Sequence, residues 1–366
     1  MTDINTPDPS DENPFSRMRR IRSRQRAEVS GAMTPLLSAY FGTERDKTLD
    51  EELSLLIDAF LEADSVEDSR RVGRLHEGRA LTVTGASGAG KSRALERLFI
   101  KREEFLGYGN KESDCPLISV TAPSPCTLRL LGESILKTIG YPVTRKLDEN
   151  VAWDLVHQNL PLRGIRFIHI DELQHVAQSR NKVEIGKVQD TLKALMQDKD
   201  WPVWLILSGL PSVATFLAKD PQVWRRTRHV VFRDLEMPGD GPMIRKLVEF
   251  YGKDKGGRTV EITEDADFIG RLHHAASGRF GVMVELIQDS VRQALHLRDT
   301  SLLVDHFVAV FAARTGCVRE DNVFAVPTDW DLIDTSCIWD TDDPLPEKES
   351  QSGKAKPKGK QKGERK

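Results

Sequence analysis

The sequence lacks the features that mark a membrane protein or a disulfide-bonded secreted fold. No stretch of 18 or more apolar residues occurs, so no membrane-spanning helix is predicted. The first ten residues hold no apolar signal region, and the four cysteines form no C-x-x-C pair, which together favour a reducing cytoplasm. The nine histidines form no H-E-x-x-H motif. His169 and His175 have no third metal ligand near them in the sequence, so we interpret both as structural.

An excess of charge of one sign is also missing. The net charge is −3 over 366 residues, with 39% hydrophobic and 30% charged residues, which is typical of a globular protein of up to two domains. Charge is nevertheless concentrated in two places. Residues 17–26 contain six arginines, and residues 354–366 contain seven Lys/Arg and one Glu. Either block can neutralise DNA phosphates, although a solvated tail is the better interpretation of the second.

One glycine-rich stretch matches the phosphate-binding pattern G-x-x-x-x-G-K-[ST]. It lies between a short apolar run at 80–84 and a helical pattern at 93–100, which is the strand–loop–helix context that the motif requires. Glycines bring backbone N–H groups close to phosphate oxygens, the lysine reaches the β- and γ-phosphates, and the serine hydroxyl ligates Mg²⁺. The predicted nucleotide-binding residues are Gly85, Ala86, Ser87, Gly88, Ala89, Gly90, Lys91 and Ser92.

A second apolar run, 165–170, ends in an acidic pair, Asp171 and Glu172. A nucleotide site requires an acidic residue at the end of a neighbouring strand to hold the Mg²⁺ shell, and we assign that role to Asp171. Glu172 is placed to orient or deprotonate an attacking water. The two motifs together predict an ATP and Mg²⁺ site, with Ser92 and Asp171 on the metal side.

The remaining pattern predicts an α/β fold. Five short apolar runs alternate with helical stretches, which indicates a five-stranded parallel sheet with helices on both faces. From residue 241 onward the apolar spacing is entirely helical and predicts a small lid. We therefore expect the following organisation: a disordered, Arg-rich arm at 1–48, the nucleotide-binding domain at 49–238, the lid at 239–316, a partner-binding or packed segment at 317–340, and a disordered basic tail at 341–366.

This order of motifs resembles the AAA+ ATPases. In that superfamily the strand after the acidic pair carries a polar "sensor 1" residue, and the position falls here on Ser208, where Asn or Thr is usual. An arginine finger for the neighbouring subunit's site usually precedes the fifth strand, and the resemblance places it at Arg226, with Arg225 second. A "sensor 2" arginine often opens the third lid helix, which corresponds to Arg279. The catalytic residues implied are thus Lys91, Glu172, Ser208, Arg225, Arg226 and Arg279.

Within the superfamily the chain looks most like the TniB and TnsC type of transposition ATPase, over about residues 50–315. The second strand and proline loop at 116–125, the Asp-Glu-Leu-Gln-His stretch at 171–175, and the segments 208–211 and 220–226 carry this resemblance. It implies a transposon-encoded regulator that binds ATP, assembles as a homo-oligomeric ring or helical filament on duplex DNA, and recruits or activates a DDE transposase. Hydrolysis then drives disassembly, and a separate target-selection partner often takes part.

DNA contact in such relatives is mainly to the backbone, which implies weak sequence preference and strong salt dependence. The resemblance points to the segment after the second strand, and the arginine block is the other candidate. The DNA-binding candidates are Thr121, Thr127, Arg129, Arg19, Arg20 and Arg22.

Three alternatives share part of this pattern. Another AAA+ switch or loader, such as a helicase loader, an initiator-like factor or a secretion or defence ATPase, has the same catalytic residues. A small-molecule kinase or other P-loop transferase does not need arginines supplied in trans or a helical lid. A non-hydrolysing scaffold does not need Lys91, Ser92, Asp171 and Glu172 together.

Overall fold

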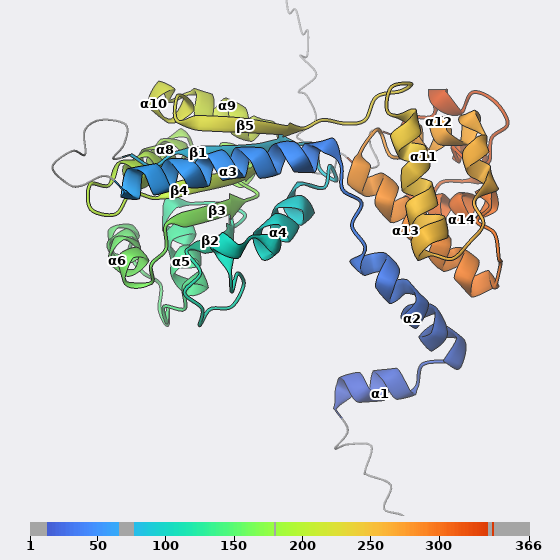
Figure 1. Cartoon of the computed structure of the whole chain (residues 1–366), viewed down its shortest axis with the longest axis horizontal. Helices are drawn as coiled ribbons and strands as arrows, with labels where there is room; N and C mark the ends of the chain where they lie inside the picture. Colours follow the sequence, from blue (N-terminus) through green and yellow to red (C-terminus); the bar gives the residue numbers. More distant parts are fainter. Residues whose placement is uncertain (1–12, 66–76, 179–180, 336–338, 340–366) are drawn as a thin grey trace, which may run out of the picture.

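The computed structural model describes residues 13–65, 77–178, 181–335 and 339 (Figure 1). The predicted basic tail at 341–366 lies outside these residues, as do Cys337 and the acid-rich start at 1–12. Among the described helices, none is long and apolar enough to cross a membrane.

The centre of the structure is a parallel sheet with the strand order β2-β3-β4-β1-β5. The prediction of five parallel strands is therefore confirmed. Because the strands run the same way, the carboxyl ends of β1, β3 and β4 meet at one edge, where α/β folds bind ligands. The strands are β1 (Ala80–Gly85), β2 (Leu117–Thr121), β3 (Phe167–Asp171), β4 (Trp204–Gly209) and β5 (Thr227–Phe232).

Helices cover both faces of the sheet, as the apolar runs require. All six residues of β1 are buried, and successive residues face opposite cores: Ala80 joins one cluster, whereas Leu81 and Val83 join the other. One face packs against α3 (Glu44–Asp64) and α4 (Lys91–Lys101). The other helices of this domain are α5 (Leu128–Thr138), α6 (Glu149–Leu162), α7 (Gln174–Ala177), α8 (Lys182–Gln197), α9 (Ser212–Ala218) and α10 (Pro221–Trp224).

After β5 the described chain is helical, which confirms the predicted lid. Its core is apolar and rich in aromatic residues; Phe268 and Phe307, for example, pack edge to face with ring centroids 5.0 Å apart. The lid helices are α11 (Gly241–Glu249), the π-helical segment η4 (Phe250–Lys255), α12 (Ala266–Ala275), α13 (Phe280–Leu297) and α14 (Val304–Thr315).

The arm predicted at 1–48 as disordered or Arg-rich is largely helical in its described part. Residues 13–48 contain α1 (Pro14–Arg20), α2 (Arg24–Ser38) and the first turn of α3. Figure 1 shows α2 beside α13 of the lid. Val29, Met33 and Leu36 are buried in the lid core, and Gln288 Nε2 donates to the Leu36 carbonyl at 3.2 Å. Burial of this apolar stripe stabilises a helix that composition alone does not favour.

The aromatic residues after α14 contact the lid. Phe324 is buried, Trp330 Nε1 donates to Asp267 Oδ1 at 2.9 Å, and Trp339 Nε1 donates to the Ala275 carbonyl at 2.9 Å. Trp330 also lies under the Arg271 guanidinium, 5.6 Å from the ring centroid.

Candidate nucleotide-binding site

The glycine-rich loop connects the carboxyl end of β1 to the first residue of α4, as predicted. Gly88 and Gly90 have φ values of +76° and +94°, a region that side chains with a Cβ rarely enter. Gly90 is also the N-cap of α4, so the unpaired N–H groups of the first helical turn open onto the loop. The backbone therefore forms the cradle that a phosphate group requires.

The Lys91 ammonium is fixed inside this cradle. Nζ donates to the carbonyls of Gly85 at 2.8 Å and Ala86 at 2.9 Å. Burial lowers the pKa of Lys91, and the nearby carboxylates of Glu172 and Asp171 oppose that shift. An ammonium has three donors, so one remains for a phosphate oxygen.

Asp171 lies at the end of β3, and its carboxylate accepts three hydrogen bonds. They come from Ser92 Oγ at 2.8 Å, from Ser208 Oγ at 2.5 Å, and from the Glu172 backbone N–H at 2.9 Å. Burial alone would raise the pKa of Asp171, but these donors and the neighbouring His169 outweigh it, so the pKa is lowered and the carboxylate stays ionised.

The oxygens of Ser92 and Asp171 suit a magnesium ion. Neighbouring ligands of an octahedral Mg²⁺ at about 2.1 Å lie about 3.0 Å apart, and Ser92 Oγ and Asp171 Oδ2 lie 2.8 Å apart. A hydroxyl and a carboxylate are also the hard oxygen ligands that Mg²⁺ prefers. The side chains predicted for the metal thus fit the ion.

Ser208 is held by a histidine that sequence analysis interprets only as structural. The Ser208 hydroxyl donates its one hydrogen bond to the Asp171 carboxylate. In the contact of 2.8 Å between His169 Nε2 and Ser208 Oγ, the ring N–H must therefore be the donor. His169 Nδ1 then accepts from Ser119 Oγ at 3.0 Å, and Ser119 in turn accepts from the Tyr108 hydroxyl at 2.6 Å. Burial lowers the pKa of His169 to about 4, which agrees with this neutral tautomer. A chain of hydrogen bonds with one direction therefore runs across β2, β3 and β4 to Asp171.

Glu172 has a strained backbone. Its φ is +57°, a left-handed conformation that costs a residue with a Cβ about 1 kcal/mol or more. The Glu172 carboxylate accepts a hydrogen bond from Gln174 Nε2, and the Leu173 N–H donates to the Ser208 carbonyl at 3.1 Å. Sequence analysis did not identify Gln174; its only local signal is an amide directly after the acidic pair.

The lid packs directly on the phosphate loop. The N–H of Gly281 in α13 donates to the Gly88 carbonyl at 2.8 Å. Arg279, the N-cap of α13, is 6% exposed, and its Cδ lies 3.9 Å from where a Cβ on Gly88 would be. Its NH1 donates to the Trp339 carbonyl at 2.7 Å. The structure thus brings the predicted sensor 2 arginine to the loop.

Two cavities meet at this loop and share Gly88, Gly90 and Arg93. One, of about 210 Å³, lies among Lys91, Ser92, Glu172 and Gln174 and suits phosphates. The other, of about 160 Å³, lies between the loop, the lid and the end of the arm. Aromatic side chains that can stack on a planar base line the second cavity. They are Tyr40, Phe41, Phe232, Tyr251 and Phe280.

Arg225 and Arg226 lie at the opposite edge of the sheet, beside the start of β5. Six residues of strand separate the two edges, about 20 Å, so neither arginine reaches the phosphate loop of its own chain. Arg226 is paired with Glu77 at 2.5 Å. Arg225 is exposed, and it forms no ion pair with any residue that the structure describes. Both face a cavity of about 460 Å³ that Arg79 and Arg228 also line.

The DNA-binding candidates fall in two separate regions (Figure 1). Thr121 ends β2, Thr127 caps α5 by accepting from the Leu130 N–H, and Arg129 on α5 pairs with Glu133 at 2.7 Å. The arginine candidates are Arg19 and Arg20 in α1 and Arg22 just after it, all in the arm. The side chain of Arg20 is not among those that the structure describes. The structure does not bring the two sets together within one chain.

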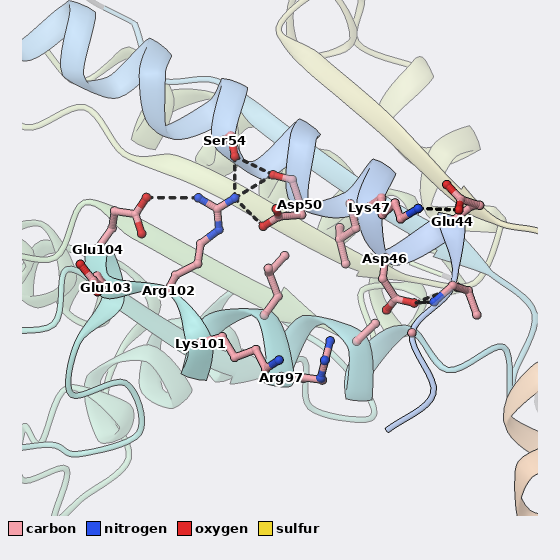
Figure 2. A pocket seen from close by; sticks show the side chains of 15 residues that line it. Glu44, Asp46, Lys47, Asp50, Ser54, Arg97, Lys101, Arg102, Glu103 and Glu104 are labelled. Atoms are coloured by element: carbon pink, nitrogen blue, oxygen red, sulfur yellow. Dashed lines mark hydrogen bonds and ion pairs between the residues drawn. The ribbon is translucent and has the colours of Figure 1, made fainter. Parts of the chain in front are cut away.

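A further hollow lies between α3 and α4 and is separate from the phosphate loop. It has a volume of about 980 Å³, and several of its charged side chains pair with one another (Figure 2). Arg102 donates to Asp50 at 2.6 Å and to Glu104 at 3.2 Å, and Lys47 pairs with Glu44 at 2.6 Å.

Comparison with known proteins gives one family match, which covers most of the sheet domain. Residues 64–236 match the family described as "Bacterial TniB protein". No match was found among curated protein sequences.

Solved structures of similar fold include the ORC1 protein of Aeropyrum pernix in complex with DNA, at 20% identity and a TM-score of 0.53, covering 79% of this chain and 70% of that one. CDC6P of Pyrobaculum aerophilum is similar at 12% identity and a TM-score of 0.53, covering 76% and 69%. At these identities the likeness is one of fold: a parallel sheet domain followed by a helical region.

Proposed function

Residues 64–236 match the TniB family, and from that premise we propose that the chain is an ATP-dependent regulator of DNA transposition. In this proposal it binds ATP and Mg²⁺, assembles on duplex DNA, and recruits or activates a DDE transposase. The observation that carries the proposal is one edge of the sheet. There the family match covers the loop lysine Lys91 and the acidic pair, and Arg279 from the lid, beyond the matched residues, lies beside the loop.

The residues of this edge divide the work of hydrolysis. Bound Mg²⁺ offsets charge on the β- and γ-phosphates. Lys91 and the loop N–H groups hold the same phosphates, and Asp171 and Ser92 face the metal. Glu172 orients a water and accepts its proton as the water oxygen bonds to the γ-phosphorus. The bond to the β,γ-bridging oxygen breaks, which yields ADP and phosphate.

An arginine from a second copy completes the site. Because Arg225 and Arg226 lie at the far edge of the sheet, they serve a neighbouring chain in a ring or filament. Arg225 is the better candidate on the geometry, since Arg226 already pairs with Glu77. This reverses the order that the resemblance gave. Assembly and hydrolysis are then linked, because the finger reaches its target only in the oligomer.

The segment after β2 offers a route from DNA to the acidic pair. The Ala122 N–H donates to the Asp171 carbonyl at 2.8 Å, and His175 Nδ1 lies 3.0 Å from the Ala122 carbonyl. Duplex DNA bound at Thr121 and Thr127 would therefore act on the backbone that carries Asp171. The structure of ORC1, a protein of similar fold, is that of a complex with DNA, which supports a DNA partner for this chain.

The direct test is mass photometry with negative-stain imaging, with and without ATP and random duplex DNA, at low and moderate salt. The expected result is large rings or filaments that need both ATP and DNA and that weaken as salt rises. Lys91→Ala, which removes the loop ammonium, serves as the matched negative control. A monomer or dimer that ignores DNA would overturn the proposal.

A second candidate function is an AAA+ loader or initiator-like switch, which the fold of ORC1 and CDC6P favours. It uses the same catalytic edge but acts on a protein partner. Rings or filaments that form along random DNA with ATP and no added partner separate the two. DNA binding is compatible with both candidates, but only the transposition regulator is expected to assemble in this way.

A further inference from the structure

We propose that Gln174 is a positioning residue for Glu172, the carboxylate that activates water. This inference rests on the proposed ATP hydrolysis. It concerns a residue that lies in the first turn after the acidic pair and that the resemblance over 171–175 contains but gives no role.

Gln174 is the first residue of the short helix α7 and is 4% exposed. It borders the phosphate-side cavity together with Lys91, Ser92 and Glu172. A buried primary amide needs partners for both of its polar ends, and here it has them.

The orientation of the amide follows from its partners. The Leu210 backbone N–H, which can only donate, lies 3.2 Å from Gln174 Oε1. The carbonyl end is therefore turned to Leu210, and the NH₂ end donates to Glu172 Oε2. Since Leu210 follows β4, the side chain of Gln174 ties the end of β4 to the carboxylate that follows β3.

Glu172 requires such a tie. Its left-handed backbone, with φ of +57°, directs the side chain out of the regular path of β3. The Glu172 N–H is fixed to Asp171 Oδ1 at 2.9 Å, which secures the backbone and leaves the side-chain torsions free. The amide of Gln174 removes that remaining freedom from the carboxylate.

The neighbouring backbone is built around this amide. A Cβ placed on Gly209 would overlap Gln174 Oε1 and would come within 2.9 Å of Val213 Cγ2. Only a glycine at 209 leaves room for the amide where it lies. This is a second observation, independent of the hydrogen bonds, that Gln174 occupies a site made for it.

The consequence is a separation of kcat from ATP binding. Both polar ends of the amide are used by protein partners, so Gln174 adds little to the affinity for phosphates. Its loss leaves Glu172 present but misdirected, which lowers the rate of the chemical step.

The test compares Gln174→Met and Gln174→Glu with the parent chain. Methionine keeps the length without hydrogen bonds, and glutamate keeps the acceptor for Leu210 but places a second carboxylate against Glu172. The control is Gln189→Glu, because Gln189 Nε2 donates to the Phe216 carbonyl at 2.5 Å away from the phosphate cavity. ATP affinity is measured with a fluorescent nucleotide, and kcat and KM by phosphate release.

We expect kcat to fall about tenfold or more in both variants, with ATP affinity and KM within about threefold of the parent. In a Glu172→Gln background, Gln174→Met should cause no further loss, since it acts only through that carboxylate. The control should keep the parent's kcat.

An unchanged kcat, an equal loss of ATP affinity, or a further loss in the Glu172→Gln background would each overturn the inference while leaving the proposed function standing. A parent chain that binds ATP and DNA without turning over would remove the hydrolysis step of the proposed function and the inference with it. The parent measurement therefore tells the two failures apart.

Discussion

Replacing Gly281 with alanine tests whether the lid must contact the phosphate loop for ATP to bind. Gly281 lies in the first turn of α13, and its N–H donates to the Gly88 carbonyl at 2.8 Å. An alanine Cβ at this position would lie 2.5 Å from the Gly88 oxygen, whereas ordinary contact begins at 3.4 Å. The lid must therefore move away from the loop by about 0.9 Å, the difference between these two distances.

The expected magnitude follows from two opposing effects. Alanine is the better helix former by up to about 1 kcal/mol, so α13 itself is not weakened. The displaced lid loses the hydrogen bond to Gly88, worth about 1 kcal/mol, and Arg279 moves with it. A loss of this size in the docked state lowers ATP affinity about fivefold, while the melting temperature without nucleotide changes little.

The assay is nucleotide titration together with thermal unfolding, with Gly186→Ala as the matched control. Gly186 lies inside α8 and a Cβ there would meet nothing within 4 Å, so alanine adds helix propensity without a clash. The control should keep the parent's ATP affinity. Parental affinity in Gly281→Ala would refute the reasoning, because the lid contact would then contribute nothing to binding.

Three further predictions concern the catalytic edge, the subunit contact and the thiols. Glu172→Gln should bind ATP, hydrolyse it poorly and lengthen the lifetime of complexes on DNA, measured by single-molecule imaging; parental turnover would exclude Glu172 as the base. Arg225→Ala should lower DNA-stimulated hydrolysis by 100-fold or more, on the order expected for an arginine finger, while Arg226→Ala, which breaks a pair with Glu77, should act mainly on stability; the reverse pattern would restore Arg226 as the finger. Burial raises the pKa of the Cys126 thiol to about 11, so at pH 8 alkylation followed by mass spectrometry should modify half-buried Cys317 well before Cys126.

The catalytic edge was largely predictable because its residues follow local patterns. Asp171 and Ser208 lie at the carboxyl ends of apolar strands, Glu172 directly follows one of them, and Lys91 follows the glycine loop after another. Parallel strands bring these carboxyl ends to one edge. The sequence order of motif and strand is thus enough to place these side chains together.

The residues that orient them were not predictable, since their contacts depend on register between strands. His169 acts on Ser208 because the alignment of β3 with β4 brings the ring beside the hydroxyl. Gln174 reaches Leu210 only through two turns that follow different strands. No spacing of residues in the sequence indicates such contacts. A histidine in an apolar strand has the same sequence pattern whether it only packs in the core or donates a hydrogen bond to a site residue.

The arm illustrates a pattern that was present and overlooked. Val29, Met33 and Leu36 are spaced as one face of a helix, but the neighbouring arginines made the segment read as a charged arm. Their partner, α13, lies more than 240 residues away along the chain, since Gln288 contacts Leu36. Only the folded lid gives this stripe a surface to cover.

The packing of α2 on the lid also has a mechanical consequence. Two linkers, residues 39–43 and 233–240, join the lid and α2 to the sheet domain. Arg45 holds the two together by donating to the Arg233 carbonyl at 3.2 Å, and its guanidinium lies over the Phe232 and Phe280 rings. Two neighbouring linkers define an axis of rotation between the lid and the sheet domain. We therefore expect any motion of the lid relative to the phosphate loop to be mainly a rotation about that axis.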